Sequence, residues 1–264
     1  MIVFAGLVPH SPLLIQSVGK EKRDLLAGTL KAYEAIEKTL YVAKPETIVV
    51  ISPHAPSYPD AFSANMAPKY TGTLKAFGDH QTTISAEGDF LLLDRLQREL
   101  RGEGVPFTLS SNEELDYGFT VPLLLLTSHL TDWKLVPFAP AALDAQAHFD
   151  FGKKLHDILH RESARVAILA SADLSHKLTA DSPGGASAEG PAFDATIRSK
   201  LLKLDAEGLL SLDPHAIEAA GQCGYRPIMT LLGILQTMNA KPHELCYEAP
   251  FGVGYLTMQF DLGT

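Results

Sequence analysis

The stretch IVVISPHAPSYPD, residues 48–60, places His54 just beyond a run of four β-branched residues. Such a run favours a buried strand, and the prolines before and after the histidine fix the backbone that carries it. The start of the chain repeats this arrangement, because His10 lies between two prolines just beyond the apolar run IVFAGLV at residues 2–8. Two histidines in the same setting, each following a strand, indicate a common role.

Strands and helices alternate along the rest of the chain. Strand-like runs rich in Val, Ile, Leu or aromatic residues occupy 2–8, 47–52, 105–109, 134–138, 165–170 and 253–260. Apolar residues at helical spacing mark 20–43, 87–102, 145–161, 191–203 and 226–238. Residues 62–85 have the pattern of additional strands and turns. This alternation predicts an α/β fold, a single three-layer domain over residues 1–264 with a central mixed, largely parallel sheet and helices on both faces.

The composition is that of a globular protein, and it argues against several kinds of partner. Hydrophobic residues make up 46% of the chain, and the formal net charge is −9 with no basic run. We therefore expect neither nucleic acid nor a membrane surface as a partner. The start of the chain lacks a basic n-region, and no apolar stretch approaches the length that spans a bilayer. Two cysteines imply no disulfide framework, so we expect a cytoplasmic location.

Ligands of open α/β sheets bind beyond the carboxyl ends of the strands, and three histidines follow strands here. His10 and His54 follow the first two strands, and the segment SADLSH, with Asp173 and His176, follows the run RVAILA. A single histidine in such a place often only caps a turn or bonds a backbone carbonyl. Three of them, two in nearly the same turn, favour a metal site, since neutral imidazole is a common ligand of Zn, Cu and Fe.

Two further segments are polar. Three histidines of the helix predicted at 145–161 share a polar face, where we expect them to be solvated: His148, His156 and His160. The segment TADSPGGASAEGP, residues 179–191, is rich in glycine and small residues and begins three residues after His176. We expect it to be the most mobile part of the chain, and it is either a lid over the site or an uninvolved surface loop.

Two glycine-containing turns each precede a strongly apolar helix. The stretch EELDYGFTVPLLLL (113–126) carries Tyr117, and AAGQCGYRPIMTLLGIL (219–235) carries Cys223 between two glycines. A free cysteine in such a turn is commonly a small buried residue. The functional alternative is a thiolate ligand, because the N-terminus of a helix lowers the pKa of a thiol. We expect the other cysteine, Cys246, to be inert.

Five motifs in order resemble the LigB-like class III extradiol dioxygenases and the related Memo proteins: LVPHSPLL, ISPHAP, LDYGFTVPL, SADLSH and CGYRPIMTLLGIL. The resemblance covers nearly the whole chain and implies an α/β domain with its active site in a cleft above the sheet. In the dioxygenase branch two histidines and a carboxylate hold a ferrous iron, and the matching histidines are His10 and His54. His176 matches the catalytic acid/base histidine of the family.

The sequence departs from the dioxygenase pattern at two positions. Tyr117 stands where that branch has a histidine after the aspartate, and Cys223 occupies the region of its glutamate ligand, as in Memo-type proteins. Two histidines and a cysteine form a softer donor set, better suited to Cu(I) or Zn. Three carboxylates remain as further candidates for the third ligand, although none matches the family position: Glu218, Glu244 and Glu248.

The leading hypothesis is a ferrous-iron extradiol dioxygenase-like protein that uses O₂ on a catecholic aromatic substrate. His176 would act as general base, Tyr117 would hydrogen-bond oxygen or substrate, and Asp173 would orient its neighbours. The alternative is a Memo-like metal-binding or redox protein with a site of two histidines and Cys223 and no ring cleavage. A third reading, a zinc hydrolase, uses the same histidines to activate water. A homo-oligomer is compatible with each of these.

Overall fold

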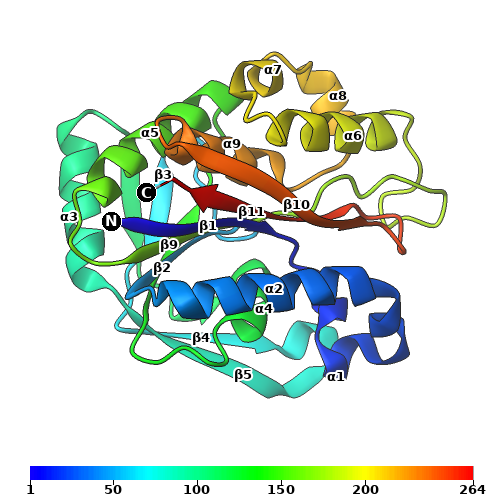
Figure 1. Ribbon diagram of the computed structural model, residues 1–264, viewed down its shortest axis with the longest axis horizontal. Helices are drawn as coiled ribbons and strands as arrows, with labels where there is room; N and C mark the ends of the chain where they lie inside the picture. Colours follow the sequence, from blue (N-terminus) through cyan, green and yellow to red (C-terminus); the bar gives the residue numbers. More distant parts are fainter. Residues whose placement is uncertain (264) are drawn as a thin grey trace.

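The predicted α/β architecture is confirmed in the computed structural model, which describes residues 1–263 (Figure 1). The strands are β1 (Ile2–Val8), β2 (Thr47–Ile51), β3 (Phe62–Asn65), β4 (Lys69–Leu74), β5 (Asp79–Gly88), β6 (Phe107–Ser110), β7 (Glu114–Leu115), β8 (Lys134–Ala139), β9 (Val166–Ser171), β10 (Ala240–Glu248) and β11 (Tyr255–Leu262). The α-helices are α1 (Gln16–Gly19), α2 (Ala27–Ala43), α3 (Phe90–Gly102), α4 (Tyr117–Leu126), α5 (Ala145–His160), α6 (Glu189–Leu201), α7 (Ala206–Leu210), α8 (Pro214–Ala219) and α9 (Tyr225–Leu235).

The sheet is mixed and its centre is parallel. Strand order along the main path is β10-β11-β1-β9-β2-β8-β5-β4-β7, and β3 joins β8 and β6 beside it. Strands β1, β9, β2 and β8 run parallel to one another, whereas β11 pairs antiparallel with β1, and β10 with β11. In this register Val8 lies opposite Ser171 and Ile51 opposite Ala170, so β1, β9 and β2 end at the same edge.

Helices cover both faces of the sheet, as predicted. Figure 1 shows α2 and α4 on one side and α5, α6 and α9 on the other. Successive residues of β2 alternate between two hydrophobic clusters, because neighbouring side chains of a strand point to opposite faces. Val49 and Ile51 belong to the cluster under α5 and α9, and Ile48 and Val50 to the cluster under α2 and α4. The strand that leads to His54 is therefore buried on both faces.

The helix boundaries differ from the sequence pattern in several places. Residues 20–26 form a 3-10 turn rather than the start of α2, and the segment before Asp89 belongs to β5. Helices α7 and α8 were not predicted, because five and six residues are too few for a hydrophobic period. Each begins with an aspartate that caps it, Asp205 accepting from Gly208 N and Asp213 from His215 N. None of the helices within residues 1–263 is long and apolar enough to cross a membrane.

The prediction that His148 is solvated is wrong, because its side chain is fully buried. Its ring packs edge-on against Phe62 of β3, with ring centroids 5.0 Å apart, and its Nδ1–H donates to the carbonyl oxygen of Asp144 at 2.7 Å. Helix α5 is also crossed closely by α9, where Gly152 and Gly233 let the two backbones meet. A helix packed on two sides buries a wider arc than its apolar stripe, which explains the error.

Burial lowers the pKa of His148 to about 4, from an ordinary value of 6.5. As the pH falls between these values, the unfolded chain binds a proton at this residue and the folded chain does not. The free energy of unfolding should therefore fall with pH, by up to roughly 3 kcal/mol for this group. We expect His148→Phe to lose that part of the acid sensitivity in urea unfolding of chelator-treated protein at pH 5 and pH 7.5. His160→Gln, at an exposed position, is the control. An unchanged difference between the two pH values in His148→Phe would contradict the assignment.

Candidate metal centre

Three side chains that could bind a metal meet at the carboxyl edge of the parallel strands. His10 comes from the turn after β1, His54 from the turn after β2 and Cys223 from the turn before α9, and one ligand atom from each lies within 4.8 Å of the others. The Nε2 atoms of His10 and His54 are 2.9 Å apart, and Cys223 Sγ is 3.5 Å from His10 Nε2. The imidazole planes are nearly perpendicular, at 89°. The Nε2 atoms of the two histidines therefore point toward each other, as expected from the similar turns that carry them.

The spacing of these atoms suits a small metal ion. Two nitrogens at about 2.0–2.1 Å from a tetrahedral ion stand roughly 3.3 Å apart, and a nitrogen and a thiolate sulfur stand roughly 3.6 Å apart. The observed separations of 2.9 Å and 3.5 Å are within half an ångström of these values. The donor set of two imidazoles and a sulfur fits a transition metal rather than magnesium or calcium.

Ser171 determines which nitrogen of His10 is free. The Ser171 hydroxyl donates its hydrogen to the carbonyl oxygen of Gly118 at 2.6 Å, so it can only accept from His10 Nδ1, 2.9 Å away. His10 therefore carries its proton on Nδ1, and the lone pair of Nε2 points to His54 and Cys223. The backbone N–H of His10 donates to Asp173 Oδ1 at 2.9 Å, which fixes the turn itself. Both supporting groups are buried.

Replacing Ser171 by alanine should weaken metal binding without removing a ligand. Hydrogen bonds to the far nitrogen of a ligating imidazole hold its tautomer and orientation, and their loss costs metal affinity by about 10–100-fold. We expect a loss of that size in competition titrations with a chromophoric chelator. Nitrogen-15 NMR of His10 should show a mixture of tautomers in Ser171→Ala and one tautomer in the wild type. One tautomer in both proteins would refute the role of the serine.

Tyr117 lies against the outer side of His54. Its hydroxyl is 2.8 Å from His54 Nε2, and the two rings stack with centroids 4.3 Å apart. Tyr117 opens α4, and Asp116 caps this helix by accepting from Gly118 N at 2.7 Å. A side chain at Gly118 would place its Cβ 2.4 Å from Ser52 Oγ, so only glycine lets α4 approach the end of β2 this closely. The tight packing of that helix brings Tyr117 to the atoms that could bind a metal.

Asp173 and His176 lie at the other side of the cluster. Asp173 Oδ2 is 3.6 Å from His10 Nε2, and His176 Nε2 is 4.0 Å from Cys223 Sγ. The segment between them is held by the buried Asp194, which accepts from Ser175 N at 2.9 Å. All six residues singled out in the sequence thus converge, although their roles in binding and catalysis stay predictions.

The environment of the two candidate ligand histidines, His10 and His54, favours their neutral forms. Burial, reinforced by the neighbouring histidines, lowers the pKa of His10 to about 3 and that of His54 to about 4. Burial also raises the pKa of Asp173 to about 6. The pKa of the Cys223 thiol is raised well above its usual value by burial and then by the charge of Asp173. The sequence argument predicted a lowered thiol pKa from the helix N-terminus; desolvation outweighs that partial charge here.

The other carboxylates considered as third ligands lie elsewhere. Glu244 forms an ion pair with Arg198 at 2.6 Å, and Glu248 accepts from Thr29 N at 2.7 Å. Glu218 lines the neighbouring cavity but is outside the group of three donors. Sequence reasoning missed two supporting serines: Ser171, which accepts from His10 Nδ1, and Ser52, whose hydroxyl accepts from His54 N at 3.3 Å. Their signal was visible, since each ends or directly follows a strand that leads to a site residue.

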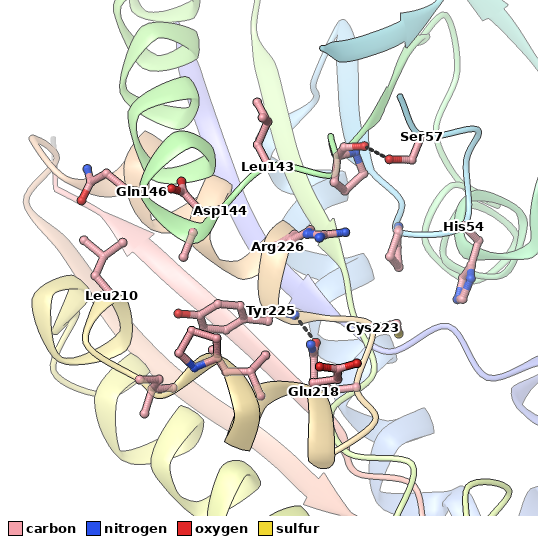
Figure 2. Close-up of a pocket in the computed structure, with 17 residues that line it drawn as sticks. His54, Ser57, Leu143, Asp144, Gln146, Leu210, Glu218, Cys223, Tyr225 and Arg226 are labelled. Atoms are coloured by element: carbon pink, nitrogen blue, oxygen red, sulfur yellow. Dashed lines mark hydrogen bonds between the residues drawn. The ribbon is translucent and has the colours of Figure 1, made fainter. Parts of the chain in front are cut away.

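A cavity of about 790 Å³ opens beside the cluster, and His54 and Cys223 form part of its wall. Figure 2 shows the wall continuing through the start of α9, where Tyr225 and Arg226 lie, and along the turn that carries Leu143 and Asp144. A substrate in this space could reach the metal-binding atoms from one side.

The segment predicted as a mobile loop follows His176, but its last residues are helical, because α6 begins at Glu189. The remainder is tied back to the site segment. Gly184 N donates to His176 O and Ser187 N to Lys177 O, both at 3.0 Å. The expected nearness to His176 is confirmed, and its mobility and action as a lid stay predictions.

The chain is similar to a known protein family and to curated proteins. A family model described as the catalytic LigB subunit of aromatic ring-opening dioxygenase matches residues 5–258. Protein CA_C1420 of Clostridium acetobutylicum is 29% identical over 97% of this chain and 56% of its own length. A MEMO1 family protein of Methanosarcina acetivorans is 27% identical over 46% of this chain and 42% of its own length. The chain thus spans about half the length of the curated relatives it matches.

The fold also occurs in a solved structure. The crystal structure of protein JW3007 from Escherichia coli K12 superimposes with a TM-score of 0.66 and covers 97% of this chain and 99% of its own. Because the two sequences are only 19% identical, the match supports the fold alone.

Proposed function

The chain belongs to the LigB family, and from this premise we propose that it is a metal-dependent extradiol dioxygenase-like protein acting on a catecholic aromatic substrate with O₂. The observation that carries the proposal is the cluster of His10, His54 and Cys223 beside an open cavity. The proposal includes a cytoplasmic location, supported by the two free cysteines, and a single domain over residues 1–264.

Ferrous iron is the proposed metal, and its role when bound is to bring catechol and O₂ together at open coordination positions. His10 and His54 would hold it through their Nε2 atoms, which the buried Ser171 and the turn prolines aim at one point. Asp173 keeps His10 in place by accepting from its backbone N–H. Zn and Cu are the other metals that this donor set suits.

The remaining residues of the site handle the substrate. His176 lies within reach of the cluster, 4.0 Å from Cys223 Sγ, and would accept the proton of a catechol hydroxyl as general base. The Tyr117 hydroxyl, 2.8 Å from His54 Nε2, would donate a hydrogen bond to the substrate or to oxygen beside it. The cavity walls would exclude water around the ring.

The proposal is tested by reconstituting the purified protein anaerobically with Fe(II) and presenting a broad panel of catechols with O₂. Ring-cleavage products, followed by their absorbance, are the expected result. His176→Gln should keep its iron and lose about 10²–10⁴-fold in kcat, the usual contribution of a general base. No cleavage of any catechol by the fully loaded wild type would refute the proposal.

A second candidate function is a Memo-like metal-binding or redox protein without ring cleavage. The specific observation in its favour is Cys223, whose sulfur lies in the donor group where a carboxylate would suit iron better. Elemental analysis of freshly purified protein separates the two candidates. Copper retained by the wild type and lost in Cys223→Ser would favour the second.

A further inference from the structure

Asp194 is a buried carboxyl group that the proposed reaction does not use. It lies on α6, and only 1% of its surface is exposed. No cation lies at ion-pair distance from it within residues 1–263, and Arg198 on the same helix is paired with Glu244 instead. Burial raises the pKa of Asp194 to about 6. A buried carboxyl group costs free energy unless its oxygens are hydrogen-bonded, so the partners of Asp194 indicate its role.

Both oxygens of Asp194 are engaged, and one of them holds the segment that carries His176. Oδ1 accepts from the backbone N–H of Ser175 at 2.9 Å, one residue before His176. Oδ2 accepts from the hydroxyl of Tyr247 on β10 at 2.8 Å. A side chain at Gly254 would place its Cβ 2.0 Å from Oδ2, so the turn before β11 packs directly on the carboxylate. The carboxylate therefore joins α6, β10 and the SADLSH segment at one point.

Ser175 also bonds the turn that carries Cys223. Its hydroxyl donates to the carbonyl oxygen of Ala220 at 2.7 Å, and its backbone forms an antiparallel bridge with Gln222. Ser175 is fully buried, so these bonds are shielded from water. The His176 segment and the Cys223 turn are thus fastened to each other through the residue that Asp194 holds.

We propose that Asp194 is a positioning residue for the candidate metal centre, and that it sets, through Ser175, where His176 and Cys223 stand relative to each other. These two side chains come from segments 47 residues apart in the chain, and His176 Nε2 lies 4.0 Å from Cys223 Sγ. The inference goes beyond the proposed function, because it concerns an arrangement that both candidate functions use and that does not depend on ring cleavage.

The test measures the binding of Co(II), whose absorption spectrum acquires a charge-transfer band when a thiolate coordinates it. Metal-free protein is titrated with Co(II), and this band is followed. Asp194→Ala should bind Co(II) about tenfold or more weakly and with a shifted band, the scale of loss that accompanies removal of a supporting group. Asp194→Asn should stay within about twofold of the wild type, because an amide can accept from Ser175 N–H and donate to the Tyr247 oxygen.

Asp89→Ala is the matched control. Asp89 is also buried and also accepts from one backbone N–H and one hydroxyl, those of Leu92 at 3.1 Å and Thr47 at 2.6 Å. Thr47 begins β2 and His54 follows the end of that strand, so Asp89 lies at the opposite edge of the sheet. Its loss should lower the melting temperature, as the loss of Asp194 does, and leave the affinity for Co(II) and the band unchanged.

Tyr247→Phe keeps the test decisive if Asp194→Ala does not fold. It leaves Asp194 Oδ2 without its donor but removes only one oxygen atom, and the affinity for Co(II) should fall by about threefold. Wild-type affinity and spectrum in Tyr247→Phe, and in Asp194→Ala if it folds, would overturn the inference. So would an equal loss in Asp89→Ala or in Asp194→Asn, or a wild type that binds no Co(II) through Cys223. A protein that passes this test yet cleaves no catechol would refute the proposed function and leave the role of Asp194 unaffected.

Discussion

The His10→Ala and His54→Ala proteins are each expected to lose bound metal during purification. Each substitution removes one donor of the His10, His54 and Cys223 group and leaves the other imidazole without its partner at 2.9 Å. The loss of affinity should exceed the 10–100-fold that accompanies removal of a supporting hydrogen bond, so metal content should fall from one ion per chain to a trace. Mass-spectrometric elemental analysis after dialysis is the measurement.

Two safeguards make this result decisive. His10 is buried, and its removal opens a small cavity, so far-ultraviolet circular dichroism and a thermal melt must show that the variant folds. His54 is partly exposed and gives the same information with less risk to the fold. His160→Ala removes an exposed histidine from α5 and should keep the full metal content. A complete complement of metal in both His10→Ala and His54→Ala would place the metal elsewhere.

Bound metal is expected to protect Cys223 from alkylation, by at least tenfold in rate. Its sulfur is 3.5 Å from His10 Nε2 and would be coordinated in the loaded protein, and a coordinated thiolate is not free to react. Cys246 is the internal control, because it lies on β10 beside Glu248 and outside the donor group. Its labelling rate should be the same with and without metal. Equal labelling of Cys223 in both conditions would remove it from the ligand set.

The Cys223→Ser protein extends this test to the choice of metal. A serine hydroxyl is a hard, weak donor, so affinity for Cu(I) or Zn should fall by roughly 100-fold or more, whereas iron held by the two imidazoles should be retained better. Competition titrations with each metal measure the difference. Equal affinities of wild type and variant for all three metals would show that the sulfur makes no contribution, which favours the dioxygenase reading over the Memo-like one.

Much of the site could be predicted from local sequence. Residues 48–51 form a buried strand because β-branched side chains pack well on both faces of a sheet, and the histidine beyond it must then lie at the sheet edge. The same reasoning placed His10, Asp173 and His176. The positions of the Tyr117 and Cys223 side chains could not be predicted as well, because a residue in a glycine turn before a helix can point in many directions. Their candidate roles came from the family resemblance.

The wrong predictions about His148 and Cys223 have the same cause. His148 has the spacing of a surface residue, yet it is buried, because α5 is covered both by α9 and by the sheet. Cys223 stands at a helix N-terminus, yet its pKa is raised, because burial and Asp173 oppose the helix dipole. In both cases the environment is made by segments far away in the chain, which no local pattern describes.

The sequence by itself determined the strands, the turns that end them and the chemical identity of the donors, because backbone preferences and hydrophobic periods act within a few residues. Only the tertiary structure decided that Cys223 lies 3.5 Å from a histidine 213 positions earlier. It also decided the tautomer of His10, through a serine from β9 whose hydrogen goes to the backbone of α4. Distances, burial and proton positions depend on which elements pack together, and that packing is a property of the whole chain.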